Sequence, residues 1–300
     1  MAEKEHPPKE KPHSGEARPV SVPKKPEGKP SEKQVAGSVP RKTAHPPSGL
    51  RVNVYSVEGE VKGSVDLPRA FGHEPRPDLV NRAVITIQAN RRQPYGHSPR
   101  SGMRHAVSWW GKGRGVSRVP RLTGSRRGAQ ANNTVGGMPG HGPKSWRDWT
   151  QKINRKENHL AKLSALAATK EAALVSSRGH RYKESLSLPV VVEDALEGIE
   201  QTEKAQEIFS KLGVWEDVQQ SRLSHHLRPG KGKLRGRPFR TKRSVLVVLS
   251  SRDHARAFEN LSGVEVTTPR GLNAENLAPG GHLGRLAVFS EKALEEVATW

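Results

Sequence analysis

The pattern of apolar and polar positions along most of the chain predicts an α/β protein. Some segments show short apolar runs, and others show apolar residues spaced by three or four positions. Short apolar runs typical of strands occur at 51–55, 61–65, 188–192, 244–249, 264–267 and 285–289. Apolar residues spaced by three or four positions predict helices at 77–90, 154–167, 202–212 and 291–298. Strands that alternate with helices predict a mostly parallel sheet covered by helices on both faces.

Several residues mark where the predicted helices begin and end. Asn154 and Glu157 form a variant of a capping box, which predicts a helix start. Asp253 is expected to cap a helix that follows the 244–249 strand, and Ser290 to cap the last helix. Gly213 is expected to end the 202–212 helix.

Two segments lack this periodicity. Residues 1–49 contain ten prolines and almost no large apolar side chains, which predicts a tail that is disordered on its own. Residues 91–147 contain eleven glycines and five prolines, which break both helix and strand. A loop of this length inside a domain must be disordered or held by something other than its own core. We therefore expect one α/β domain over 50–300, interrupted by an arm at 91–147 and a basic loop at 222–243.

Charge is distributed unevenly along the chain, which has a formal net charge of +21. Residues 79–147 hold 13 basic and no acidic residues, and residues 218–252 hold 10 basic and no acidic residues. An ordinary surface intersperses both signs. Segregation of this kind predicts that the two acid-free windows bind a polyanion while the rest forms a normal globule.

Tryptophan also concentrates at the first window, because four of the six tryptophans lie in or beside it. A solvated linker is the alternative for this segment, but linkers avoid tryptophan. RNA-binding segments use aromatic and arginine side chains to stack on bases. The candidate rRNA-binding residues are Arg91, Arg92, Arg100, Arg104, Trp109, Trp110, Lys112, Arg114, Arg118, Arg121, Arg126, Arg127, Lys144, Trp146, Arg147, Arg228, Lys231, Lys233, Arg235, Arg237 and Arg240.

Three glycine-rich strings invite a cofactor interpretation that the spacing does not support. The string at 111–115 does not follow a strand and lacks dinucleotide-binding spacing, although its backbone can approach phosphate closely. In the string at 137–145, Pro143 removes a backbone donor that a phosphate-binding loop needs. The string at 277–284 is better explained as a tight turn. No cofactor is expected.

Catalytic and metal sites are not predicted either. The chain has no cysteine, and its 13 histidines show no metal-ligand spacing. Asp253 and His254 follow a strand without a nucleophile elbow, which favours helix capping over hydrolysis. The chain has no run of 18 apolar residues and no secretory signal. Two rival classes stay open: an α/β enzyme with a basic substrate loop, such as a tRNA-modifying enzyme, and a DNA-compacting or membrane-surface protein.

Several strings together resemble one family. Ser108-Trp-Trp-Gly-Lys-Gly-Arg-Gly115, with Val119-Pro-Arg121 after it, is similar to the arm of large-subunit ribosomal protein L four in its archaeal and eukaryotic form. Further similar strings follow in order at 144–147, 164–169, 178–180, 189–192, 228–233 and 277–285, the last running into 288–293. The resemblance covers 50–300 and leaves 1–49 outside.

The resemblance implies a cytoplasmic, non-enzymatic constituent of the large ribosomal subunit that contributes to subunit assembly. It implies an arm that reaches through rRNA to the peptide exit tunnel. The expected partners are large-subunit rRNA, neighbouring ribosomal proteins and the nascent peptide, with no membrane and no homo-oligomer. The double Trp109-Trp110 departs from the single aromatic common in relatives. The residues implied to lie near the tunnel are Trp109, Trp110, Gly111, Lys112, Arg114, Val116 and Arg118.

Overall fold

The computed structural model describes residues 50–253 and 255–300, so the predicted tail at 1–49 and His254 lie outside the described residues. Its centre is a six-stranded sheet in the order β2-β1-β5-β10-β8-β9. The β1–β2 pair is antiparallel and the other pairs are parallel, which confirms the mostly parallel sheet. The strands are β1 Arg51–Tyr55, β2 Val61–Asp66, β5 Val190–Val192, β8 Leu246–Val248, β9 Glu265–Thr267 and β10 Ala287–Ser290.

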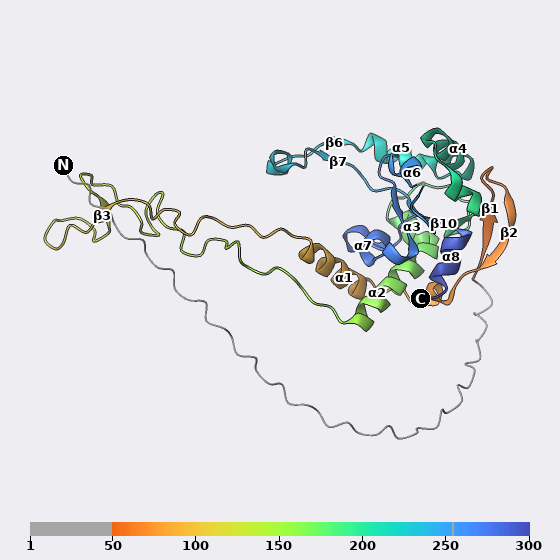
Figure 1. Ribbon diagram of the computed structural model, residues 1–300, viewed down its shortest axis with the longest axis horizontal. Coiled ribbons are helices and arrows are strands. Elements are labelled where there is room, and N and C mark those ends of the chain that lie inside the picture. Colours follow the sequence, from red (N-terminus) through yellow and green to blue (C-terminus); the bar gives the residue numbers. More distant parts are fainter. Residues whose placement is uncertain (1–49, 254) are drawn as a thin grey trace, which may run out of the picture. The chain divides into compact units, whose positions relative to one another are not determined.

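Helices pack on both faces of this sheet (Figure 1). One face contacts α1 Pro77–Asn90, α2 Arg155–Ala167, α7 Ala274–Leu277 and α8 Glu291–Val297. The other face contacts α3 Ala172–Ser177, α4 Thr202–Leu212, α5 Trp215–Leu223 and α6 Arg256–Glu259. The helix α5 was not predicted from the sequence.

The apolar run at 244–249 explains why the sheet is buried on both sides. Side chains of a strand point alternately to opposite faces. Val245, Val247 and Leu249 therefore join one core, while Leu246 and Val248 join the other. All five are at most 1% exposed. A strand buried on both faces reads as a continuous apolar run, as the sequence has here.

The predicted helix ends are right at three positions and wrong at one. The hydroxyl of Ser290 accepts a hydrogen bond from the Ala293 amide, and Gly213 ends α4 with a φ of +76°. Helix α2 begins directly after Asn154 as predicted, although the Asn154 side chain makes no cap hydrogen bond and the capping box itself is therefore wrong. The capping prediction for Asp253 is also wrong, because the residue before α6 is Ala255 and Asp253 is exposed.

Residues 91–147 contain no helix and only the two-residue strands β3 Val107–Ser108 and β4 Arg121–Leu122 (Figure 1). The two limbs of the segment run antiparallel. The His97 amide donates to the Pro143 carbonyl at 3.3 Å, and β3 pairs with β4 farther along. A side chain at Gly102 would overlap the backbone of Gly137. The limbs therefore contact each other through backbone, which explains part of the glycine content.

The basic loop contains a short hairpin that was not predicted. Strand β6 His226–Leu227 pairs with β7 Phe239–Arg240, antiparallel. The tip is a 3-10 turn at Lys231–Arg235, followed by Gly236 with a φ of +73°. We call residues 225–243 the basic hairpin.

Candidate nucleic-acid interface

The basic residues of 91–147 have almost no acidic partners. Arg91 pairs with Glu275 at 2.8 Å, at the end of α1. No other basic residue of this segment forms an ion pair with the residues that the structure describes. Most of these side chains are exposed. The segment thus presents a row of uncompensated positive charges.

Arginine and lysine contact the tryptophans of this segment. The guanidinium carbons of Arg92 and Arg147 lie 3.9 and 4.3 Å from the ring centre of Trp149. The Lys144 ammonium lies 5.5 Å from the ring of Trp146, which is 66% exposed. Two cation–π contacts thus engage Trp149, which was not among the candidate rRNA-binding residues. Trp146 has one such contact and stays open to further stacking.

The turn at 111–115 is open on all sides. Gly111, Gly113 and Gly115 have φ values of +82°, +76° and +67°. L side chains rarely adopt this conformation, so glycine is required here. A Cβ atom at any of the three would have no neighbour within 4 Å, so packing does not explain them. Lys112 and Arg114 between them are exposed.

Arg121 has a local role that its place among the candidate RNA contacts did not suggest. Its guanidinium donates to the carbonyl oxygens of Ser117, at 3.1 Å, and Arg126. It also lies 5.4 Å from the ring of Trp110. Arg121 therefore holds the turn around 117–126 together.

The basic hairpin exposes its charges at the tip and an aromatic pair at its base. Lys231, Lys233, Arg235 and Arg237 are all exposed. The rings of His225 and Phe239 stack at 4.6 Å with an angle of 27°, and both are exposed. The Arg228 guanidinium donates to the Phe239 carbonyl at 3.4 Å across the hairpin.

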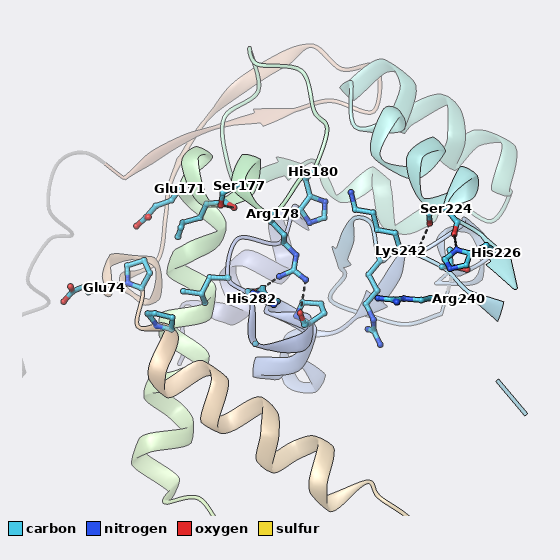
Figure 2. Close-up of a pocket in the computed structure, with 18 residues that line it drawn as sticks. Glu74, Glu171, Ser177, Arg178, His180, Ser224, His226, Arg240, Lys242 and His282 are labelled. Carbon is cyan, nitrogen blue, oxygen red and sulfur yellow. Dashed lines mark hydrogen bonds between the residues drawn. The ribbon is translucent and has the colours of Figure 1, made fainter. Parts of the chain in front are cut away.

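A cleft of about 1070 Å³ lies where the basic hairpin meets the domain. Figure 2 shows Arg240, Lys242 and His226 on one side of it and Glu74 and Glu171 on the other. Its lining also includes Arg178, His180, Arg243 and His282. We call this the basic cleft. Of the candidate residues from the sequence, only Arg240 lines it.

Two cations of the basic cleft are held by neutral acceptors. Arg178 donates to the carbonyl oxygens of Pro279, at 3.0 Å, and His282. Lys242 donates from Nζ to the Gly179 carbonyl and to Oε1 of Gln220, both at 2.7 Å. Neutral acceptors fix the position of a charge without cancelling it.

Further ionisable residues are buried in the cleft wall or behind it. His180 and Asp217 are buried, with Nδ1 of the ring 2.9 Å from Oδ2 of the carboxylate. Arg285 is fully buried and pairs with Glu265, which also pairs with Arg243. Burial, followed by repulsion from Arg243, lowers the pKa of Arg285 to about 9. The group is still a cation at neutral pH.

The two ends of the parallel strands carry opposite charges: basic residues lie where the strands begin, and acidic residues lie where they end. Lys242 and Arg243 precede β8 and Arg285 precedes β10, so they gather where the parallel strands begin. Glu193 and Glu197 follow β5, where the strands end. Open α/β sheets usually bind ligands at the carboxyl ends of their strands. Here that edge bears carboxylates, which repel phosphate.

At the carboxyl edge, two serine hydroxyls hold Glu197 in place. Ser250 and Ser290 donate hydroxyl hydrogen bonds to Glu197 at 2.6 Å each, and Ser290 also caps α8. The serines therefore hold secondary structure. Within the described residues there is no group of three metal-ligating side chains and no helix able to cross a membrane.

The sequence did not identify the basic cleft because its residues come from four distant segments. Arg178, Lys242 and His282 lie far apart from one another in the sequence. A signal was present, because the family-like strings at 178–180 and 277–285 contain Arg178 and His282. Nothing in their spacing indicated that they meet.

An α/β domain with two exposed basic segments that have few acidic partners among the described residues, and with acidic residues at its usual ligand edge, is typical of the class of proteins that bind a polyanion. The sequence matches the model of the Ribosomal protein L4/L1 family over residues 65–300, and the chain belongs to this family. The family is one of ribosomal proteins and not of enzymes.

Curated relatives are similar over most of their length. The chain is 44% identical over 247 residues to the Large ribosomal subunit protein uL4 of Thermoplasma acidophilum, covering 82% of this chain and 97% of the relative. It is 43% identical to the protein of the same name from Methanopyrus kandleri, covering 82% and 97%. It is also 43% identical to that of Halorubrum lacusprofundi, covering 83% and 99%.

Proposed function

We propose that this protein is a structural constituent of the large ribosomal subunit in the cytoplasm and binds large-subunit rRNA. Its relatives are named as large ribosomal subunit proteins, and it is similar to them over nearly their whole length. Its partners are rRNA and neighbouring ribosomal proteins, and it acts as a monomer within the subunit. Binding in two places, through 91–147 and 222–243, links separate rRNA segments and so supports subunit assembly.

Residues 91–147 act as an arm that threads through folded rRNA from the 50–300 domain. The observation that carries this proposal is that the basic residues between Arg92 and Arg147 have no acidic partner among residues 50–253 and 255–300. Thirteen basic residues without an acid in the 79–147 window repel one another in the free protein. Phosphates packed around the arm remove that repulsion. Such contacts position the chain and read little sequence.

The tip of the arm lines part of the peptide exit tunnel. The family resemblance of the string at 108–115 supports this assignment, as does the open turn at 111–115. Trp109 is 54% exposed, and Lys112, Arg114, Val116 and Arg118 are exposed beside it. The nascent peptide would therefore contact the indole ring of Trp109 and the positive charges at this tip. Trp110 and Gly111 belong to the same tunnel-proximal set.

The salt dependence of binding tests the RNA proposal. About eight phosphate contacts give a slope of roughly −5 to −7 for log affinity against log salt concentration. The assay measures binding of the full chain to a large-subunit rRNA fragment between 50 and 300 mM KCl, with duplex DNA of equal length as competitor. A slope of about −1 to −2, or equal competition by DNA, contradicts the proposal.

A further inference from the structure

The basic cleft has the features of a second RNA contact, separate from the arm and from the hairpin tip. It has about 1070 Å³ of space, near the upper end of typical ligand sites. Arg240 and Lys242 belong to the basic hairpin, so the cleft continues a surface already assigned to RNA under the proposed function. Arg178 and Lys242 are held in place before any ligand arrives.

A buried polar atom in the cleft wall is left without a partner. His180 lines the cleft, and its side chain is 1% exposed. Asp217 engages Nδ1, and Nε2 has no hydrogen-bond partner within the described chain. Buried polar atoms are nearly always paired, so an unpaired one at a cleft wall marks a place for a ligand atom.

The charges around the cleft favour an anion as that ligand. Burial, with repulsion from Arg285 and Arg243, lowers the pKa of Arg178 to about 10. Arg243 and Arg285 both pair with Glu265, and both repel Arg178, which Asp217 attracts. An anion between Arg178 and Lys242 would relieve this repulsion.

We propose that the basic cleft holds the sugar–phosphate backbone of an rRNA strand, with Arg178 and Lys242 contacting phosphate and Nε2 of His180 accepting a hydrogen bond from a ribose hydroxyl. This rests on the proposed rRNA binding and adds a site to it. RNA is favoured over an acidic peptide because the cleft opens beside the basic hairpin. Glu74 and Glu171 on the other side of the cleft repel phosphate, so an RNA backbone would lie along the hairpin side.

Substitutions in the cleft test this through the salt slope. The double variant Arg178→Gln with Lys242→Gln should reduce the magnitude of the slope by about 2, because each lost phosphate contact removes about 1. The control double variant Lys204→Gln with Lys211→Gln changes two exposed lysines on α4 and should leave the slope unchanged. The single variant Arg178→Gln should reduce the magnitude of the slope by about 1. Arg178→Lys keeps the positive charge and should restore part of that magnitude.

A photo-cross-linking residue at position 177 gives a second readout that does not depend on charge removal. Ser177 is exposed and lines the cleft, whereas Glu203 on α4 is exposed elsewhere. In full-chain protein bound to rRNA, a cross-linker in place of Ser177 should attach to RNA, and one in place of Glu203 should not.

The outcomes separate this inference from the proposed function. If the wild-type chain does not bind rRNA, both fail. A second outcome overturns the cleft proposal alone. In it, the wild-type chain binds with the expected slope, the cleft variants keep that slope, and position 177 does not cross-link to RNA. Cross-linking from position 177 to a neighbouring protein instead of RNA, in assembled subunits, also overturns it.

Discussion

The side-chain amide of Gln130 donates from Nε2 to the carbonyl oxygen of His105 at 2.7 Å. The same nitrogen donates to the Met103 carbonyl at 3.1 Å, and the Gln130 carbonyl accepts from the Met138 amide at 3.2 Å. Gln130 is the one non-glycine residue with positive φ among the described residues, at +62°. The side chain of Gln130 thus ties its own stretch of the 91–147 segment to residues 103–105, while its backbone carbonyl contacts residue 138.

Removing this side chain should loosen the arm without unfolding the domain. Gln130→Gly relieves the backbone strain but deletes two hydrogen bonds, which together contribute about 1–3 kcal/mol locally. We expect faster hydrogen exchange at the Met138 amide and weaker rRNA binding, because a disordered arm loses more entropy on binding. Gln130→Ala loses the same bonds and keeps the strain, so its arm should exchange at least as fast. Wild-type exchange rates in the glycine variant would contradict the role of Gln130.

Deleting the outer arm should leave the domain folded. No residue between Arg100 and Arg127 is buried, and none belongs to either apolar core. Replacing this stretch with a short glycine–serine linker should shift the melting temperature by only about 2–4 °C, equivalent to roughly 1 kcal/mol. Differential scanning calorimetry of the free protein measures this. A much larger loss would mean that the arm supports the core.

Glu197 should make the stability depend on acidic pH. Burial raises the pKa of Glu197, but hydrogen bonds from Ser250 and Ser290 outweigh it and hold the pKa below its ordinary value of 4.5. A carboxyl with a lowered folded pKa stabilises the fold above its unfolded pKa, and this contribution is lost as pH falls through the folded pKa. Glu197→Gln should therefore destabilise the protein by about 1 kcal/mol at pH 7, because solvent screens a partly exposed group.

The pH series provides the control for Glu197. The difference in unfolding free energy between wild type and variant, measured with urea, should shrink as pH is lowered below about 4.5. A difference that stays constant from pH 7 to pH 3 would show that the carboxylate charge is not involved.

Arg285 should contribute to stability through the acceptors that it satisfies. It donates to the carbonyl oxygens of Ser244 at 3.1 Å and Asn276 at 2.7 Å, and it pairs with Glu265. Arg285→Met keeps apolar volume but leaves these buried acceptors unpaired, so urea unfolding should show a loss of about 2–4 kcal/mol. Arg243→Met removes only a half-exposed partner of Glu265 and should cost at most about 1 kcal/mol. Equal losses in the two variants would contradict this account.

The sequence predicted the sheet and the long helices because their buried faces are mostly apolar. The helix α5 was missed because its buried face includes Asp217 and Ser221 besides Val218. Asp217 is satisfied by His180, and Ser221 donates to the Lys242 carbonyl. A helix that buries polar groups against distant partners has no apolar periodicity to detect.

The capping errors have a similar origin. Glu157 has the sequence position of a capping-box residue, but it pairs with Arg82 of α1 at 2.7 Å. The ion pair with a residue distant in sequence therefore replaces the local capping contact that the sequence pattern predicted. The charge windows, in contrast, are properties of composition and required no contacts, so the two basic segments were visible from the sequence. The basic cleft required the fold to bring Arg178 and Lys242 together.

Co-sedimentation tests the central claim most directly. Tagged full-length protein is expressed in its source cells, and large subunits are pelleted through a sucrose cushion containing about 0.5 M NH₄Cl, where the screening length is below the usual 8 Å of physiological salt. We expect one copy per large subunit to remain, because buried contacts along the arm are screened far less than surface contacts. A protein that washes off completely, or that sediments with other particles, would contradict the assignment as a structural constituent of the large subunit.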